Sequence, residues 1–299
     1  SGGNLTISSG DDGVHADANL QVDGGTIDIK KCYEGLEGVH ITLNDGDISI
    51  VASDDGINAA DGSSSSGMGM GGFGGGQASS SDSSVLLTIN GGNIFVNAGG
   101  DGLDSNGNIV MNGGNVTVLG PTSDGDTALD FDGTFTINGG VLMAFGSSGM
   151  LETPTTAQNG CCIVTTLGTV SANSAFSLTD SSGNVIMSYI PTKNYASAIV
   201  YSSDIKSGST YTVTAGSTTQ SITVNSNVTT NGVSGGFGGG QNGGFGGGQR
   251  GGQPGGSAPD GNGSFGGGQQ GGNQQGGMPG GNSGNGRSNS VSSSTVNQV

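Results

Sequence analysis

A short unit recurs through the first half of this 299-residue chain. Gly-Gly or Asp-Gly opens each unit, at positions 2, 24, 45, 91, 113 and 139, which gives spacings of 22, 21, 46, 22 and 26 residues. The longest interval contains a Gly- and Ser-rich segment at 63–84, and without its 22 residues that unit has 24. A repeat of this length indicates a solenoid of stacked coils.

Each unit carries three short apolar patches. The first and third patches alternate apolar with polar residues, which is typical of strands with one buried face. The first patch comprises Ile27/Ile29, Ile48/Ile50, Ile94/Val96, Val116/Val118 and Leu142/Ala144. The third comprises Leu20/Val22, Ile41/Leu43, Leu87/Ile89, Ile109/Met111 and Phe135/Ile137. The second patch is a single aliphatic residue, at Val14, Leu36, Ile57, Leu103 and Leu129.

Three short strands in a unit of about 22 residues, joined by Gly turns, predict the triangular coil of a parallel β-helix. A leucine-rich repeat would need a Leu-x-x-Leu-x-Leu pattern and a helical segment, and the chain has neither. We therefore expect an all-β fold, with a β-helix over 1–152 and an inserted loop at 63–84. The third strand ends in a polar residue that predicts a turn ladder, with each side chain bonding turn amides of the next coil: Asp23, Asn44, Asn90, Asn112 and Asn138.

An acidic phrase surrounds each aliphatic residue of the second patch. If the coils stack at roughly 4.8 Å, these phrases form two columns of oxygen atoms. One column comprises Asp12, Glu34, Asp55 and Asp101, with Asp11 and Asp54 beside it. The other comprises His15, Glu37, Asn58, Asp104 and Asp130, which point outward because the aliphatic residues next to them point inward.

Carboxylates at this spacing repel one another and raise one another's pKa unless cations lie between them. Calcium suits such columns because it accepts about six to eight oxygen ligands in flexible geometry. A mixture of Asp, Glu and Asn without Cys argues against zinc and other soft metals. The sequence therefore predicts Ca2+ on the two columns, with a merely solvated acidic face as the alternative.

The chain is strongly acidic, with a formal charge of −17. Residues 1–160 hold 20 of the 23 acids and only Lys30 and Lys31 as basic residues. Such a surface repels nucleic acid and anionic lipid, so we expect neither as a partner. No apolar run approaches the roughly 20 residues of a membrane span. The chain opens inside a repeat without a visible signal peptide, so we interpret it as a mature or excised form.

Three phrases occur in an order that carries a resemblance: 11–17 (DDGVHAD), 33–38 (YEGLEG) and 53–60 (SDDGINAA). With 180–184 (DSSGN) and 206–211 (KSGSTY), the chain over roughly residues 1–225 resembles the carbohydrate-binding, pectate-lyase-like β-helix proteins on the surface of clostridia and related bacteria. The resemblance implies a right-handed parallel β-helix, bound calcium, and binding of cellulose-like or acidic sugars without cleavage.

The same resemblance places metal ligands on the acids of the three matching phrases: Asp11, Asp12, Asp17, Glu34, Glu37, Asp54 and Asp55. The phrase around Asp130 departs from the pattern because Thr127 replaces its leading acid. A metal at that phrase would need Asp124 or Asp126 as a substitute.

The period is lost after residue 152. Short alternating runs over 153–231 predict a small antiparallel β unit that caps the solenoid, whose open end would otherwise expose strand edges. Its tyrosines, at positions 189, 195, 201 and 211, are expected in packing roles rather than as sugar-stacking rings. Residues 232–299 form a low-complexity Gly, Gln, Ser and Asn tail, which predicts a flexible tether, with a polymerising tail as the alternative.

Three functions are compatible with these features. The first is a noncatalytic, calcium-dependent, extracellular or cell-surface protein that binds an acidic or cellulose-like polysaccharide. The second is a structural or adhesive filament subunit that binds copies of itself. The third is a polysaccharide lyase, which needs a base and a group that neutralises the uronate. Because the β-helix segment contains no Arg, we expect no enzyme activity.

Overall fold

The computed structural model describes residues 2–61 and 84–233. Most of the inserted segment 63–84 and the tail beyond residue 233 lie outside the described residues. The described residues form strands and no helix, and therefore include no helix that could cross a membrane. The strands are β1 (Asn4–Ser8), β2 (Val14–Cys32), β3 (Leu36–Ala52), β4 (Ile57–Ala59), β5 (Leu86–Ile89), β6 (Asn93–Asn97), β7 (Leu103–Ser105), β8 (Asn108–Met111), β9 (Asn115–Leu119), β10 (Leu129–Phe131), β11 (Phe135–Ile137), β12 (Val141–Gly146), β13 (Thr156–Ala157), β14 (Cys161–Val170), β15 (Phe176–Thr179), β16 (Val185–Tyr189), β17 (Tyr195–Ser202), β18 (Thr210–Ala215), β19 (Thr218–Thr223) and β20 (Val228–Asn231).

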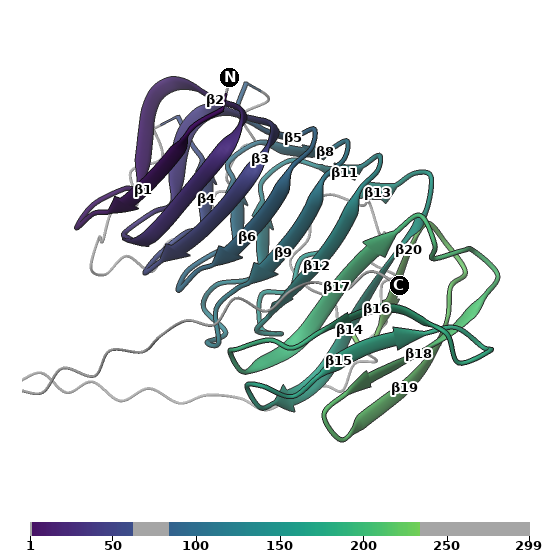
Figure 1. Ribbon diagram of the computed structural model, residues 1–299. Coiled ribbons are helices and arrows are strands. Elements are labelled where there is room, and N and C mark those ends of the chain that lie inside the picture. The colour runs from purple at the N-terminus through teal and green to yellow at the C-terminus, as the bar shows by residue number, and fades with distance from the viewer. Residues whose placement is uncertain (1, 62–83, 234–299) are drawn as a thin grey trace, which may run out of the picture. The chain divides into compact units, whose positions relative to one another are not determined.

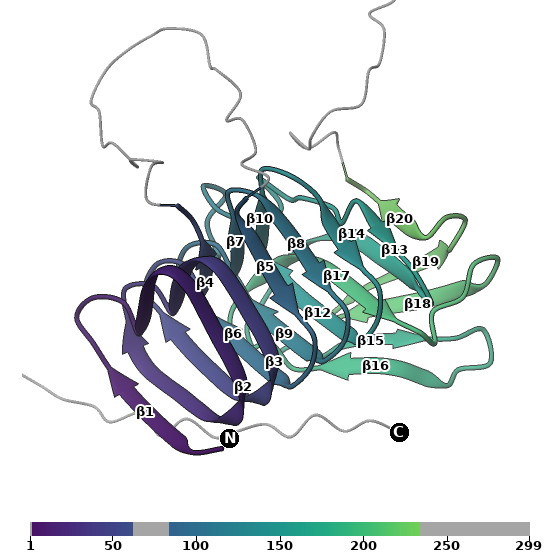
Figure 2. The ribbon, with the colours of Figure 1, turned by 90° about the horizontal axis from the view of Figure 1, so that it is seen from above.

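The repeats stack as a parallel β-solenoid with three faces, which confirms the predicted fold (Figures 1 and 2). The first face consists of β1, the ends of β2 and β3, β6, β9 and β12. The second face consists of the starts of β2 and β3 with β4, β7 and β10. The third face consists of the middles of β2 and β3 with β5, β8, β11 and β13.

The alternation of the sequence sets the register of the coils. Ile48 pairs with Ile94 and Ile94 with Val116, so residues at equivalent repeat positions lie above one another. The inward-facing residues form one continuous core, in which Ile50, Ile57 and Leu103 have no exposed surface. β-Branched side chains suit this arrangement because they pack well on a pleated surface with one buried face.

Gly56 shows why Gly follows the acid in the repeated phrase. A Cβ atom at this position would lie 2.1 Å from Val96 Cγ1 and 2.5 Å from the carbonyl oxygen of Gly102. The backbone therefore turns against its neighbouring coil at a distance that only Gly permits. This close turn brings Asp55 to the outside and Ile57 to the inside.

A ladder of side-chain amides runs along the turn between the third and first faces. Each Asn Nδ2 donates to the Oδ1 atom of the preceding coil, from Asn138 through Asn112, Asn90 and Asn44 to Asp23, over 2.7–2.8 Å. The predicted ladder is present, but its bonds join side chain to side chain instead of reaching turn amides. Asp23 ends the ladder because a carboxylate accepts without needing to donate.

We expect Asn112→Ala to lower the free energy of unfolding by about 1–2 kcal/mol, because it removes one ladder donor and one ladder acceptor. Urea unfolding followed by circular dichroism measures this loss. Asn19→Ala is the matched control, since Asn19 is exposed on the third face and makes no side-chain hydrogen bond with the described residues. Equal unfolding midpoints for the two variants would contradict a stabilising ladder.

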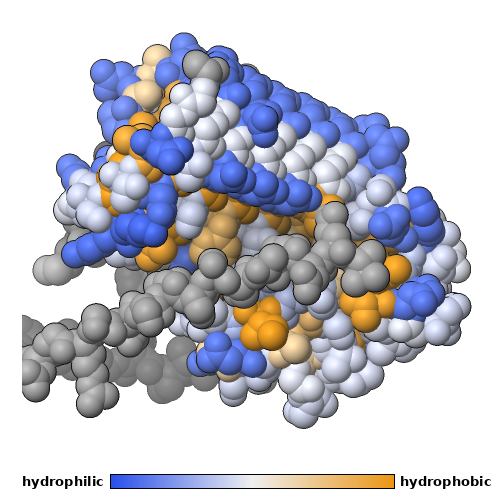
Figure 3. Space-filling model, in the orientation of Figure 1, coloured by the Kyte–Doolittle hydropathy of each residue, from blue (hydrophilic) through white to orange (hydrophobic). Residues whose placement is uncertain are grey.

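The segment after the solenoid divides into two parts. β17 pairs antiparallel with β12, and β14 and β20 follow, so these three strands extend the first face of the solenoid. β16, β15, β18 and β19 form a separate antiparallel sheet. Phe145, Phe176 and Met143 belong to one buried apolar cluster shared by this sheet and the first face. Apolar surface is also visible between the solenoid and the C-terminal strands (Figure 3).

The tyrosines of this segment serve packing, as expected. Tyr195, Tyr201 and Tyr211 are buried, and Tyr189 stacks on Phe145 with ring centroids 5.8 Å apart. Cys32, Cys161 and Cys162 are buried and unbonded.

Candidate functional site

The register brings the predicted acidic residues together in two parallel rows on the second face. Strand pairing aligns the row that we call the outer row: His15, Glu37, Asn58, Asp104 and Asp130. Backbone hydrogen bonds between successive coils align the corner row, which comprises Asp12, Glu34, Asp55, Asp101 and Thr127. The two columns expected from the sequence therefore exist as rows of side chains.

Asp11 and Asp54 lie in a third position, next to the corner row. Tyr33 lies between them, because its N–H donates to the Asp11 carbonyl and its carbonyl accepts from the Asp54 N–H, each at 3.0 Å. Asp11 is thus separated from Asp54 by one coil. Asp17 lies outside the rows, and its fully exposed side chain contacts His15 Nε2 at 3.2 Å.

A histidine neutralises the N-terminal part of the rows. His15 Nδ1 contacts a carboxylate oxygen of Glu37 and lies 3.9 Å from Asp12 Oδ2. The carboxylates of Glu37 and Asp17 accept hydrogen bonds from the His15 ring and raise the pKa of His15, so the imidazolium form is favoured beside these acids. One cationic side chain therefore already offsets the charge of this part.

In the middle part of the rows, carboxylate oxygen atoms of Glu34, Asp54 and Asp55 form a cluster that we call the oxygen cradle. Ligand atoms of Glu34, Asp54 and Asp55 lie within 4.8 Å of one another. Gly100 packs directly against this cluster, since a Cβ atom there would lie 2.5 Å from Asp55 Oδ1 and 2.7 Å from Asp54 Oδ1, so no side chain fits at this position. Asn58 Nδ2 donates to Glu34 Oε2 at 2.9 Å, which turns the amide nitrogen toward the cradle.

The C-terminal part of the rows comprises Asp101, Asp104 and Asp130 and adjoins Asp55. Its carboxyl groups are mostly buried and have no positively charged partner among the described residues. Burial raises the pKa of Asp55 to about 6 and that of Asp101 to about 7, and neighbouring acids add to both effects. Burial and four neighbouring aspartates raise the pKa of Asp104 well above its usual value. The ion pairs among the described residues involve only His15 and Lys30, so no cationic side chain compensates this part.

Glu152 joins the C-terminal part from outside the repeat. Its Oε2 accepts from the Phe131 N–H at 3.2 Å, which places it beside Asp130. Burial and the charge of Asp130 raise the pKa of Glu152 to about 8. The period could not identify this residue because it follows the last complete unit. Its only signal in the sequence is an isolated acid after β12.

The two proposed substitutes for the missing acid at Thr127 lie in different places. The charge of Asp126 raises the pKa of Asp55, Asp101 and Asp130, so Asp126 faces the rows. Asp124 instead packs over Gly149, where its Cβ lies 2.3 Å from the position a Gly149 Cβ would take. Only Asp126 is therefore placed to complete this part of the rows.

Two buried oxygen atoms in the rows have no hydrogen-bond partner among the described residues. They are Asn58 Oδ1 in the outer row and Thr127 Oγ1 in the corner row. The Thr127 residue is only 1% exposed. An unpaired buried polar atom costs about 1–3 kcal/mol, so each of these atoms requires a partner that the described side chains do not supply.

Two carboxylates of the corner row use only one of their two oxygen atoms to accept a backbone hydrogen bond. Asp55 Oδ1 accepts from the Asp101 N–H at 2.7 Å, and Asp101 Oδ1 accepts from the Thr127 N–H at 2.6 Å. The second oxygen of each carboxylate accepts no hydrogen bond from the described residues. These hydrogen bonds orient the carboxylates along the row. The available ligand atoms are carboxylate, amide and hydroxyl oxygens, which suit a hard cation such as Ca2+.

Comparison with known proteins bears on the N-terminal coils. Residues 1–84 match a family model described as carbohydrate-binding domain-containing protein. This segment includes the acidic phrases around Asp12, Glu34 and Asp55 and ends before Asp101. No curated protein and no solved structure matches the chain. The match supports carbohydrate binding and does not bear on calcium.

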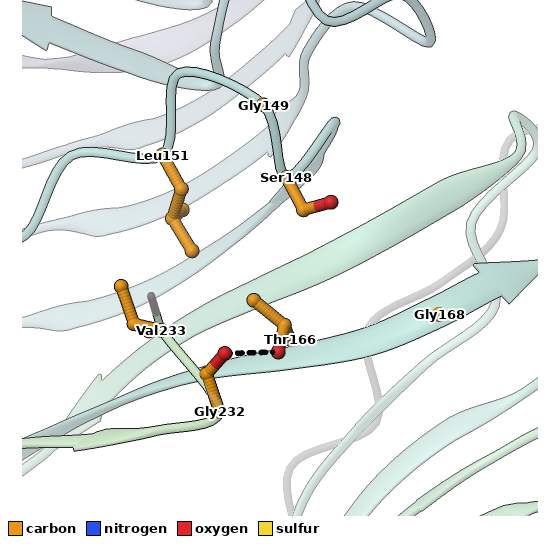
Figure 4. A pocket seen from close by; sticks show the side chains of 7 residues that line it. All are labelled: Ser148, Gly149, Leu151, Thr166, Gly168, Gly232 and Val233. Carbon is orange, nitrogen blue, oxygen red and sulfur yellow. Dashed lines mark hydrogen bonds between the residues drawn. The ribbon is translucent and has the colours of Figure 1, made fainter. Parts of the chain in front are cut away.

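The acidic rows lie on the solenoid surface, apart from two pockets near the C-terminal end of the described residues. The larger pocket has a volume of about 280 Å³ and is lined by Ser148, Gly149, Leu151, Thr166, Gly168, Gly232 and Val233 (Figure 4). Leu151 and Val233 point into it from opposite sides, and Thr166 Oγ1 donates to the Gly232 carbonyl at 2.9 Å. No ionisable side chain lines it, so it offers no charged metal ligand and no acid or base. The smaller pocket, of about 140 Å³, is lined in part by Asp124.

Lys193 is a largely buried lysine near the C-terminal end of the solenoid. Burial lowers the pKa of Lys193 to about 8, and its Nζ atom donates to the carbonyl oxygens of Ala98 and Leu119. No acid contributes to this shift, so the amine lies apart from the acidic rows. Its contacts tie the loop between β16 and β17 to the solenoid.

Proposed function

We propose that the chain is a noncatalytic, calcium-dependent carbohydrate-binding protein whose ligand is an acidic polysaccharide. The observation that carries the calcium proposal is the C-terminal part of the rows, where mostly buried carboxylates lie beside the unpaired Thr127 Oγ1 without a cationic side chain. The match of residues 1–84 supports the carbohydrate proposal. The residues proposed to hold calcium are Glu34, Asp54, Asp55, Asn58, Asp101, Asp104, Asp130 and Glu152.

The coordination number of calcium connects the calcium proposal with the carbohydrate proposal. It takes about six to eight oxygen ligands, and a shallow surface row leaves some of these positions for ligand atoms. Hydroxyl groups or a uronate carboxylate of a polysaccharide supply such atoms. Without the cation, an acidic polymer and this acidic face repel each other, so calcium is expected to be required for binding.

The described residues offer little for β-elimination. They contain no Arg, which could neutralise a uronate, and Lys193 is occupied by two carbonyl oxygens away from the rows. Burial raises the pKa values of Asp55, Asp101 and Asp104, but no lysine or arginine pairs with these carboxylates among the described residues. We therefore propose binding without cleavage.

An extracellular or cell-surface location fits the proposed cation. Exposed calcium sites of extracellular proteins typically bind with dissociation constants of about 0.1–1 mM, which only extracellular calcium saturates. Glu34, Asp54 and Asp55 in the middle part of the rows are partly exposed, so a calcium site there would be of this kind.

The binding proposal predicts retention of the protein on polygalacturonate in 2 mM calcium and its release by excess chelator. Isothermal titration with oligogalacturonate measures the affinity in both conditions, with a neutral cello-oligosaccharide as the control ligand. Absorbance of the unsaturated product in the same mixture tests for lyase activity. Equal binding with and without calcium would contradict calcium dependence, and steady product formation would contradict the noncatalytic assignment.

A further inference from the structure

Tyr33 is the one exposed aromatic residue in the part of the chain that the structure describes. Its side chain is 50% exposed, whereas the other large exposed apolar residues are Leu5, Val51, Met150, Val185 and Ile190. Burial of an aromatic ring by a partner contributes strongly to binding. Nothing in the packing of the solenoid requires a ring at this position, because Tyr33 lies in the turn between β2 and β3 and points outward.

The backbone at Tyr33 is held in place on both sides. It bonds to Asp11 in one neighbouring coil and to Asp54 in the other. The Asp54 carboxylate also raises the pKa of the Tyr33 hydroxyl to about 12. A turn fixed in this way loses little conformational freedom when a ligand binds, which favours affinity.

The ring also adjoins the oxygen cradle of the middle part of the rows. Asp54, whose N–H donates to the Tyr33 carbonyl, belongs to the cluster with Glu34 and Asp55. Gly100 lies against the Asp54 and Asp55 carboxylates and adds no side chain of its own to the cluster. An exposed apolar surface and a candidate cation position therefore lie next to each other.

We propose that Tyr33 is a stacking platform for one uronic acid residue of the polysaccharide, whose carboxylate or hydroxyl groups reach a cation held by Glu34, Asp54 and Asp55. The apolar C–H face of a pyranose ring matches the face of an aromatic side chain, while the oxygen atoms at its edge match the cation. This inference rests on the proposed function. It adds the residue that recognises the sugar ring itself.

The test compares Tyr33→Ala, Tyr33→Phe and Tyr33→Trp in the full chain, with two separate readouts. Titration with oligogalacturonate in calcium measures sugar binding, and the rise in melting temperature on addition of calcium alone measures cation binding. Tyr33→Ala is expected to weaken sugar binding about tenfold. Tyr33→Phe and Tyr33→Trp are expected to stay within about threefold of the parent chain. All three variants should keep the response to calcium.

Ile190→Ala is the matched control, because it removes a similarly exposed apolar side chain outside the acidic rows. Unchanged sugar affinity in Tyr33→Ala, with its calcium response intact, would overturn the platform and leave the proposed function standing. Absence of sugar binding by the parent chain would instead overturn the proposed function. A tenfold loss in Tyr33→Phe would show that the hydroxyl, and not the ring, is responsible.

Discussion

Without divalent cations, the protein should become less stable as the pH rises from about 4 to about 8. The pKa values of Glu34, Asp55, Asp101 and Glu152 are raised to about 7, 6, 7 and 8 in the folded chain. A group with a raised folded pKa contributes stability that is fully present below its unfolded pKa and is lost as the pH rises through its folded pKa. The folded chain binds more protons than the unfolded chain in this window, so deprotonation favours unfolding.

The expected loss is large because several carboxyls contribute. One pKa unit corresponds to about 1.4 kcal/mol, and for this coupled set we expect a combined effect on the order of 5 kcal/mol. Melting temperatures in chelator at pH 5 and pH 8 measure it. Calcium should reverse the trend at pH 8, since deprotonated carboxylates are its ligands, and should have little effect at pH 5. A chelated protein that is more stable at pH 8 than at pH 5 would contradict this account of the rows.

Asp104→Asn should change stability in opposite directions with and without calcium. Asp104 is mostly buried, lies near four other aspartates and accepts no hydrogen bond from the described residues. Replacing the carboxylate by an amide of the same shape removes this repulsion, so the calcium-free protein at pH 8 should gain about 1–3 kcal/mol. The same change removes a ligand, and the variant should lose much of the stabilisation by calcium, which is about 2.7 kcal/mol for one site at a hundredfold excess over its dissociation constant.

Asp17→Asn provides the matched control for this prediction. It makes the same chemical change at a side chain that is fully exposed and contacts only His15. We expect its unfolding curve to match that of the parent chain in both conditions at pH 8. If Asp104→Asn destabilises the calcium-free protein, the carboxylate has a partner that this account does not include.

The sequence predicted the solenoid and the acidic rows because both follow from one period. Stacking places every residue above its equivalent, so Glu37, Asn58 and Asp104 had to align once the unit was known. The same reasoning identified the Asn ladder, although not the side chain-to-side chain form of its bonds.

Features outside the period could not be found in this way. Glu152 reaches Asp130 from a segment that the repeat does not include. Tyr33 occupies a position that carries an acid in the neighbouring coils. The repeat pattern therefore indicated Asp11 and Asp54 as site residues but did not indicate Tyr33 between them. The antiparallel pairing of β17 with β12 joins residues that are 51 to 61 positions apart, and such long-range pairing leaves no local signal in a sequence.

The measurement that tests the central proposal most directly is equilibrium dialysis of the full chain against calcium at pH 7.5, with bound calcium determined by atomic emission. We predict saturable binding in the micromolar to millimolar range that decreases in Asp104→Asn and remains unchanged in Asp17→Asn. Absence of bound calcium at millimolar free calcium, or equal binding by the parent chain and Asp104→Asn, would contradict the assignment of the acidic rows as calcium sites.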